Sequence, residues 1–380
     1  MANLSLRALL DAGAIGLRHE LVEALPVPWH RRGDPAADYE LEDAALIAAI
    51  QAALLLGQPL ILAGEPGVGK TTLAPALARR LDLFFHAPVQ VKLVTAGLDL
   101  FYAFDEVARF RDAFPLSQQA SPHLAPQVGR GRGMREYVRF SSLGRAILWS
   151  AGADTMVATG SVSAREIMGD ERDTRSLRLG DIFPHEFDRT RLNSDESSKK
   201  LDITQPIRSV VLLDELDKAP RDSPNDILGE LEALTFRIQE LDLEISANPH
   251  AWPIVVITSN SERPLPDAFL RRCVFHWIEF PTERLAAIVA ARCAQEYKLK
   301  ASDLLVTSAV DIFLEMRNRV ENKKPATAEL ISFIISLFEF GFPINRRVPA
   351  NDERVKALLG TLLKTRVDLQ EGGTSINSKP

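Results

Sequence analysis

Short apolar runs alternate along the chain with longer segments in which apolar residues recur at helical spacing. The runs are rich in β-branched and aliphatic side chains and end at polar or glycine residues. Continuous apolar runs are typical of strands that are buried on both faces of a parallel sheet. We therefore predict an α/β fold whose parallel sheet is flanked by helices, with strands at residues 59–63, 89–94, 209–213, 254–259 and 274–280.

Helical spacing is clearest before the first strand and after the last one. Residues 42–56 combine high helix propensity with carboxylates in the first turn and a glycine after the last residue, which predicts a helix. Beyond residue 281 we predict helices at residues 282–297, 303–320, 326–340 and 352–369. The predicted organisation is an arm at 1–38, an α/β domain at 39–280, a small all-α domain at 281–371 and a flexible tail at 372–380.

The interval from residue 110 to residue 208 has no clear periodicity. It contains several prolines and a Gly-Arg repeat at residues 129–133. Structureless loops longer than about 15 residues are uncommon in compact domains, so we predict helices or a strand pair within the interval. We interpret the repeat as a solvated turn, and contact with nucleic acid or phosphate is the alternative.

A glycine-rich loop, Gly-Glu-Pro-Gly-Val-Gly-Lys-Thr, follows the first predicted strand and precedes a helix-forming stretch. Its glycines allow backbone N–H groups to point inward around a polyphosphate. The lysine, the hydroxyl and the helix N-terminus supply a charge for the β- and γ-phosphates, a Mg²⁺ ligand and a positive dipole end. A chance glycine turn is the alternative. The candidate nucleotide-binding residues are Gly64, Glu65, Pro66, Gly67, Val68, Gly69, Lys70, Thr71 and Thr72, of which Thr71 is also a candidate metal ligand.

Two adjacent carboxylates follow the apolar run at residues 209–213. Asp214 stands at the predicted strand end, where it can bind the Mg²⁺ of a nucleotide complex. Glu215 is suited to activate a water for attack on the γ-phosphate. A helix N-cap with ordinary first-turn acids is the alternative for such a pair. The complete phosphate loop elsewhere in the chain favours the hydrolytic interpretation.

An amide and two arginines follow in the same part of the chain. Asn260 ends the next predicted strand, where its side chain can hydrogen-bond the attacking water or the γ-phosphate. A simple turn position is the alternative for Asn260. Arg271 and Arg272 are candidates for stabilising charge in phosphoryl transfer, and one of them can act on the site of a neighbouring subunit. A surface pair at a helix C-terminus is the alternative for these arginines.

Composition narrows the class of protein. Of the 380 residues, 46% are hydrophobic and 25% are charged, which is ordinary for a globular protein with two or three structural units. A net charge of −6 argues against a generally basic, nucleic-acid-coating surface. Cys273 and Cys293 lack metal-binding or disulfide spacing. There is no signal-peptide pattern and no apolar run of about 18 residues, so we expect no membrane span and a cytoplasmic location.

Together these motifs resemble those of AAA+ ATPases, and more narrowly those of the MoxR family. Residues 64–71 resemble Walker A and residues 210–215 resemble Walker B. Asn260 falls at sensor 1, and Arg271 or Arg272 falls at the arginine finger. The resemblance implies a P-loop NTPase (AAA+) sheet flanked by helices and followed by a small all-α lid domain.

The match covers roughly residues 40–345 and is strongest over residues 213–232. Residues 235–246 resemble the pre-sensor-1 hairpin of this clade, because apolar and polar side chains alternate there. Residues 95–112 occupy the place of its helix-2 insert. Two features depart from the family pattern: residues 326–329 contain no sensor 2 arginine, and an insertion at about 150–208 separates the Walker B segment from the preceding family-like run.

The resemblance implies Mg²⁺-dependent ATP hydrolysis by a homo-oligomer, a hexameric ring, that remodels or chaperones a protein partner. Partners typical of the family are von Willebrand factor A domain proteins. A nucleotide-gated binding module that recruits a partner without needing turnover is the alternative, and binding to nucleic acid and a preference for GTP stay open. A small-molecule kinase is disfavoured by the paired carboxylates, the hairpin and the helical lid.

Overall fold

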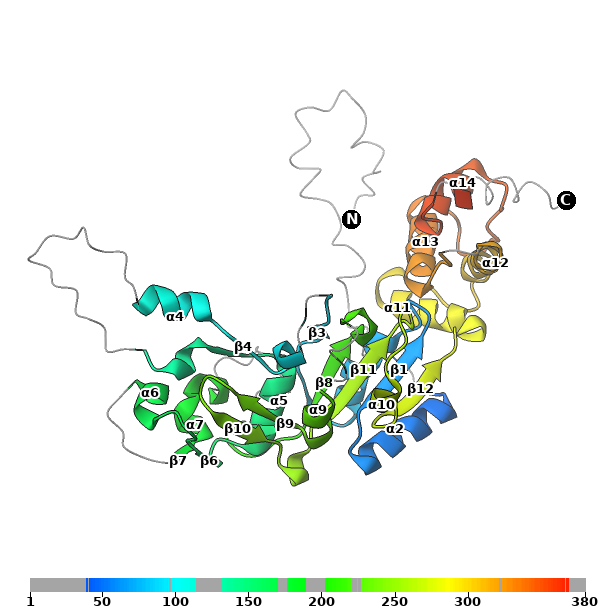
Figure 1. The fold of residues 1–380 in the computed structure, drawn as a ribbon. Coiled ribbons are helices and arrows are strands. Elements are labelled where there is room, and N and C mark those ends of the chain that lie inside the picture. The colour runs from blue at the N-terminus through cyan, green and yellow to red at the C-terminus, as the bar shows by residue number, and fades with distance from the viewer. Residues whose placement is uncertain are drawn as a thin grey trace, which may run out of the picture.

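A computed structural model gives the fold drawn in Figure 1. It describes residues 39, 41–93, 95, 97–113, 132–169, 176–188, 202–220, 224, 227–320, 323–365 and 367–368. The predicted arm at 1–38, the predicted tail at 372–380 and residues 129–131 of the Gly-Arg repeat lie outside these residues.

A six-stranded sheet forms the centre of the fold. Its strand order is β12-β1-β11-β8-β2, and β3 also pairs with β8. These pairings are parallel, which confirms the predicted parallel sheet; together with the flanking helices, the sheet is compatible with a P-loop-type fold. The strands are β1 (Leu60–Gly64), β2 (Phe84–Phe85), β3 (Val89–Gln90), β8 (Ser209–Asp214), β11 (Ile254–Ser259) and β12 (Val274–Ile278).

The strand predicted at residues 89–94 is wrong in length, because β3 ends at Gln90. The chain leaves the sheet there in a tight turn: the Thr95 N–H donates to the carbonyl of Lys92, and the Lys92 N–H donates to the Thr95 hydroxyl, both at 3.0 Å. Side-chain hydrogen bonds of this kind compete with a strand ladder. The two-residue strand β2 was not predicted, since so short a segment shows no periodicity.

Alternate residues of the central strands face opposite sides of the sheet. In β1, Leu60 belongs to one buried cluster and Ile61 belongs to the other. Helices α2 (Ala44–Leu56) and α3 (Lys70–Arg80) pack on the Leu60 side, whereas α5 (Ser142–Ala151) packs on the Ile61 side. Burial on both faces is the physical reason why the strands are continuous apolar runs in the sequence.

The interval between β3 and β8 contains helices and antiparallel strand pairs of its own, as predicted. Part of it joins the core on the α5 side of the sheet, where Phe101 stacks on Phe236 with ring centroids 5.3 Å apart. Besides α5, its helices and strands are β4 (Tyr102–Phe104) paired with β5 (Val138–Phe140), β6 (Met156–Ala158) paired with β7 (Ser176–Arg178), α4 (Glu106–Ala113), α6 (Ala164–Met168) and α7 (Leu179–Ile182).

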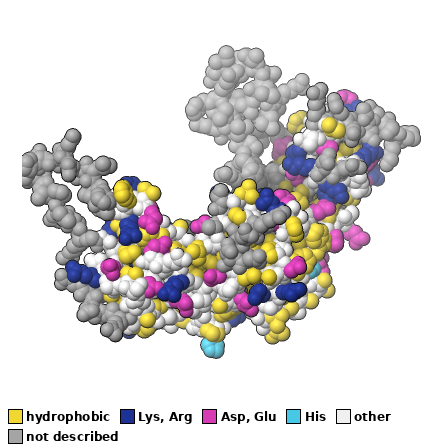
Figure 2. Space-filling view, in the orientation of Figure 1, with side chains coloured by type: hydrophobic (Ala, Val, Ile, Leu, Met, Phe, Trp, Pro, Cys, Tyr) yellow, Lys and Arg dark blue, Asp and Glu magenta, His cyan; other side chains and the backbone are white. Residues whose placement is uncertain are grey.

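The hairpin predicted at residues 235–246 is confirmed. Strand β9 (Thr235–Ile238) pairs antiparallel with β10 (Leu243–Ser246). Helix α9 (Leu228–Ala233) precedes the hairpin, and α10 (Asp267–Leu270) lies between β11 and β12. In the space-filling view of Figure 2, charged side chains of both signs are scattered over the visible face rather than gathered into one basic patch.

A cluster of helices with a separate buried core follows the sheet. Helices α11 (Leu285–Tyr297), α12 (Leu304–Arg319) and α13 (Thr327–Glu339) agree with the predicted ones. The helix predicted at residues 352–369 is wrong in length, because α14 (Glu353–Leu358) gives way to a single 3₁₀ turn around Gly360, a residue of low helix propensity. No helix in the described parts of the chain is long and apolar enough to cross a membrane.

The initial carboxylates of the first predicted helix have a different role from the one expected. Asp43 is the N-cap of α2 rather than a first-turn residue, and its carboxylate accepts from the N–H groups of Ala45 and Leu46 at 2.8 and 3.3 Å. The helix ends, as predicted, at Gly57, which adopts the left-handed conformation with φ of 65°. The left-handed turn at Gly57 ends α2 three residues before β1 begins at Leu60.

His86 is buried against the edge of the sheet. Its ring lies 4.9 Å from the ring of Trp149, and its Nε2 lies 2.9 Å from the Ser209 hydroxyl. Burial lowers the pKa of His86 to about 3, and the nearby Arg145 acts in the same direction. The imidazole is therefore neutral in the folded protein at neutral pH.

We predict that this histidine makes the fold sensitive to acid. In the unfolded chain, histidine takes up a proton near pH 6.5, whereas folded His86 does so only near pH 3. Below about pH 6.5 this difference therefore lowers the free energy of unfolding by up to about 1.4 kcal/mol per pH unit. The midpoint of urea unfolding, followed by tryptophan fluorescence between pH 7.5 and 5.0, should fall more steeply in the wild type than in His86→Gln.

The matched control is His250→Gln, because His250 is exposed. This variant should keep the pH dependence of the wild type. Equal pH dependence in the wild type and in His86→Gln would contradict the prediction.

Candidate functional site

The glycine-rich loop connects β1 to α3 at the carboxyl edge of the sheet. Gly67 and Gly69 have φ angles of 78° and 95°, which favour glycine. Gly69 is the N-cap of α3, and the helix begins at Lys70, within the loop motif itself. The first turn of a helix therefore faces the space enclosed by the loop, as phosphate binding requires.

Lys70 is buried at the base of this loop, with 6% of its surface exposed. Its Nζ donates to the carbonyls of Gly64 and Glu65 at 2.7 and 2.8 Å. Burial lowers its pKa, and the carboxylates of Asp217 and Asp214 oppose that change. The ammonium group is thus positioned by main-chain oxygens that a phosphate can replace.

The carboxylate of Asp214 connects three segments at the strand ends. Its Oδ1 accepts from the hydroxyls of Thr71 at 3.0 Å and Thr258 at 2.6 Å. Its Oδ2 accepts from the Gln90 amide at 2.8 Å. The structure therefore brings the two candidate metal ligands, Thr71 and Asp214, together. Thr258 and Gln90 were missed, because a single hydroxyl or amide in an apolar strand carries no spacing signal.

This donor set is suited to Mg²⁺. The ion accepts hydroxyl and carboxylate oxygens and usually keeps several waters, so it needs only one or two carboxylates from the protein. No group of three or more histidine, cysteine, aspartate or glutamate side chains that could bind a metal is found in the described ranges. Thr71 and Asp214 are therefore the residues here that could hold a Mg²⁺ ion, with water completing its ligands.

Glu215 lies beside Asn260, because both follow the carboxyl ends of neighbouring strands, β8 and β11. Its Oε1 accepts from the Asn260 amide at 3.0 Å, and its Oε2 accepts from the Lys218 ammonium. That hydrogen bond raises the pKa of Lys218. Glu215 has φ of 59°, a left-handed conformation that costs a non-glycine residue about 1–3 kcal/mol and is concentrated at functional sites.

The alternative role of Glu215 as a helix cap does not hold. Glu215 precedes the 3₁₀ turn Leu216–Lys218, but its side chain makes no capping hydrogen bond. It is directed to Asn260 and Lys218 instead.

Asp217 positions the segment after β11 and was missed by the sequence analysis. Its side chain is buried and accepts from the N–H groups of Asn260 at 3.3 Å and Glu262 at 3.1 Å. These two hydrogen bonds hold the backbone that presents the Asn260 amide to Glu215. Its place, two residues after an acid pair, was the available signal, but a third acid there is equally typical of a solvated turn.

A cavity of about 420 Å³ opens beside the loop, between the sheet and the C-terminal helices. Its walls are largely apolar, and its floor includes main-chain atoms of the glycine loop. Walls of this kind can accept a planar ring, and the loop beside them can accept a charged group. The sequence analysis missed it because its lining residues are far apart in the chain: Tyr39, Val68, Ile278, Phe280, Ile288 and Ile331.

Arg317, at the end of α12, fixes the C-terminal helices to the loop. Its guanidinium forms an ion pair with Glu65, donates to the Pro325 carbonyl and lies 3.5 Å from the centroid of the Phe280 ring. Only 7% of Arg317 is exposed. The arginine that reaches the loop from this helical part thus comes from residue 317, a position that no motif indicated.

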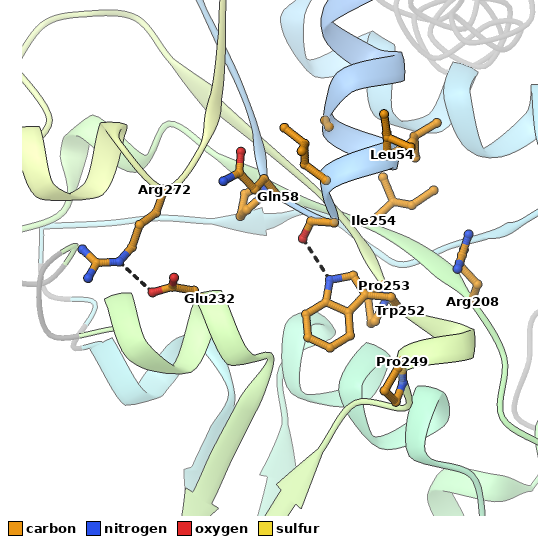
Figure 3. Close-up of a pocket in the computed structure, with 14 residues that line it drawn as sticks. Leu54, Gln58, Arg208, Glu232, Pro249, Trp252, Pro253, Ile254 and Arg272 are labelled. Carbon is orange, nitrogen blue, oxygen red and sulfur yellow. Dashed lines mark hydrogen bonds and ion pairs between the residues drawn. The ribbon is translucent and has the colours of Figure 1, made fainter.

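Arg271 and Arg272 do not join the other predicted site residues. They follow α10 and precede β12, at the amino edge of the sheet, whereas the glycine loop follows the carboxyl end of the neighbouring parallel strand β1. In Figure 3, Arg272 is turned toward Glu232, with Nε 2.7 Å from its carboxylate. The Arg271 side chain is exposed and makes no hydrogen bond or ion pair within the described part of the chain.

Figure 3 also shows the groove in which Arg272 lies. It has a volume of about 470 Å³ and is bordered by Leu54 and Trp252, whose indole N–H donates to the Gly57 carbonyl at 3.0 Å. The groove is thus at the edge of the sheet opposite to the glycine loop, and it is separate from the cavity described above.

No protein-family model matches this chain, and no curated protein matches it either. The geometry of the site is therefore the basis for assigning a function.

We predict that Arg317→Met lowers the stability of the helical part. The change removes a hydrogen bond to a buried carbonyl and an ion pair, and together these losses should cost roughly 1–3 kcal/mol. Urea unfolding followed by circular dichroism measures the change. Arg319→Met is the control, because Arg319 makes only a partly exposed pair with Glu315 on its own helix, worth at most about 0.5 kcal/mol.

A double-mutant cycle with Glu65→Gln isolates the contact between the helices and the loop. Arg317→Met and Glu65→Gln should couple by at least about 0.5 kcal/mol, because the two side chains touch. Strict additivity of the two changes would show that the ion pair does not connect these parts.

Proposed function

We propose that this protein is a Mg²⁺-dependent ATPase of the MoxR type within the AAA+ class. The observation that carries the proposal is the meeting of Thr71, Asp214, Glu215 and Asn260 at one edge of the sheet, beside a glycine loop that holds a buried lysine. A phosphate loop by itself supports only nucleotide binding. Hydrolysis also needs a group that activates water. Glu215, whose carboxylate accepts a hydrogen bond from the Asn260 amide, supplies such a group.

In the proposed reaction, Glu215 activates a water. The water oxygen bonds to the γ-phosphorus, the bond from that phosphorus to the β–γ bridging oxygen breaks, and Glu215 accepts a water proton. Asn260 keeps the Glu215 carboxylate oriented. Lys70 and the loop amides bind the phosphates. Thr71 and Asp214 would hold a Mg²⁺ ion, which would supply positive charge to the phosphate groups.

The same proposal includes assembly into a homo-oligomeric ring, of hexameric type. Arg271 and Arg272 lie at the sheet edge opposite to the loop of their own chain, so they can act only on another subunit. Arg271 is the better candidate, because Arg272 is already paired with Glu232. A von Willebrand factor A domain protein, as the client that is remodelled, completes the proposal by family resemblance.

A nucleotide-gated module without a need for turnover is the second candidate. It is favoured by Ala326 and Thr327 at the N-terminus of α13, where the family resemblance implies an arginine. The two candidates differ in whether the glutamate that activates water is required.

We predict that Glu215→Gln lowers the rate of phosphate release about 100-fold or more, because the amide cannot accept the water proton. Binding of ATP should stay close to that of the wild type, and Lys70→Ala should abolish it. Phosphate release and calorimetric titration measure the two properties. Glu339→Gln, at the exposed end of α13, is the control, and hydrolysis at the wild-type rate by Glu215→Gln would falsify the assigned mechanism.

We predict further that Arg271→Ala loses about 10³-fold in ATPase activity. Arg272→Ala should lose far less, because its exposed ion pair with Glu232 is worth at most about 1 kcal/mol. Mixing Arg271→Ala with Glu215→Gln should restore part of the activity, since an intact catalytic site receives an arginine wherever its neighbour is a Glu215→Gln subunit. Mixtures that stay inactive, or a chain that is monomeric with and without ATP, would contradict the trans role.

A further inference from the structure

The N-terminus of helix α13 lies directly against the glycine loop. A side chain on Gly67 would collide with the side chain of Ala326, and the Thr327 N–H nitrogen would lie 3.5 Å from that added atom. Gly67 has φ of 78°, so it accommodates both the turn and the close approach. The first residues of a 13-residue helix from the C-terminal part thus form one wall of the candidate nucleotide site.

Thr327, the first residue of α13, has a buried hydroxyl without a partner. Only 9% of the residue is exposed, and its Oγ1 has no hydrogen-bond partner among the residues that the structure describes. A buried polar atom left unpaired costs about 1–3 kcal/mol. Thr327 also lines the 420 Å³ cavity, together with Gly67, Gly69 and Thr72.

Other hydroxyls of the same helix are satisfied by its own backbone. Ser332 donates to the carbonyl of Ala328 at 2.9 Å, and Ser336 donates to the carbonyl of Ser332 at 2.8 Å. Thr327 is at the first helical position, so no carbonyl of a preceding helical turn is available to it. The hydroxyl thus has no partner among the described residues, and the cavity that Thr327 lines is the space from which a ligand can approach it.

We propose that Thr327 donates its hydroxyl hydrogen to a phosphate oxygen of the bound nucleotide. This inference rests on the proposed function and adds a binding residue to the same site. Phosphate is the ligand chemistry that fits, because the hydroxyl is accompanied by a helix N-terminus with its positive dipole end, and because Thr327 lines the same cavity as Gly67, Gly69 and Thr72 of the glycine loop and its helix. The contact supplies a polar group from α13 at a position that lacks an arginine.

The neighbouring ion pair keeps this wall in place. Arg317 donates to the carbonyl of Pro325, the residue before Ala326, and it also pairs with Glu65 within the loop. The N-terminus of α13 is therefore fixed to the loop before a ligand enters. A nucleotide that is bound by the glycine loop and accepts a hydrogen bond from Thr327 therefore contacts both the sheet part and the helical part of the protein.

The test compares two substitutions at the same position. Thr327→Val keeps the shape and removes the hydroxyl, so it should weaken binding of ADP about tenfold or more in calorimetric titration, as expected for a hydrogen bond to a charged group. Thr327→Ser keeps the hydroxyl and should bind ADP close to the wild-type affinity. Thr307→Val is the matched control, because the Thr307 hydroxyl bonds to helix carbonyls away from the cavity.

The choice of ligand separates the outcomes. Adenosine, which has no phosphate, should bind equally to the wild type and to Thr327→Val. An equal loss of adenosine affinity would mean that the hydroxyl serves the sugar, and unchanged ADP affinity in Thr327→Val would mean that it serves no ligand; either result overturns the inference. A wild-type protein that binds no nucleotide would instead overturn the proposed function itself, and the inference with it.

Discussion

The hydrogen bonds of Asp214 are the interaction on which the candidate site depends. One carboxylate accepts from Thr71 at the start of α3, from Thr258 at the end of β11 and from Gln90 in β3. These groups meet because the sheet is parallel, so the carboxyl ends of β8 and β11 lie at one edge, next to the loop that follows β1. In an antiparallel arrangement, neighbouring strand ends would point to opposite edges.

A second layer of contacts joins the C-terminal helices to this edge. Arg317 pairs with Glu65, and Ala326 packs against Gly67. Apolar residues from both parts line the cavity between them. Ligand binding in such a site is coupled to the relative position of the two parts, because a ligand that touches both stabilises the arrangement in which it fits. This is the physical link between nucleotide chemistry and mechanical work on a partner in the proposed function.

Much of the fold was predictable, because the sheet is buried on both faces and its strands are therefore continuous apolar runs. The glycine loop and the acid pair were predictable because their residue types are close together in the chain and have one shared chemistry. The wrong predictions concerned the lengths of a strand and a helix. In both places a local feature, a side-chain hydrogen bond or a glycine, ends the element that the apolar pattern would continue. The Thr95 hydroxyl ends the ladder after β3, and Gly360 breaks the helix predicted at residues 352–369.

The sequence by itself determined the parallel α/β sheet, the glycine loop and the order of Asp214, Glu215 and Asn260 at the ends of two apolar strands, since strand periodicity and motif spacing are local properties. Only the tertiary structure decided which distant side chains complete the site. Gln90, Arg317 and Thr327 have no distinguishing neighbours in the chain, and they matter because folding places them beside a carboxylate, a loop and a cavity. The same is true of Arg271 and Arg272, which the strand direction places at the opposite edge, away from the phosphate loop of their own chain.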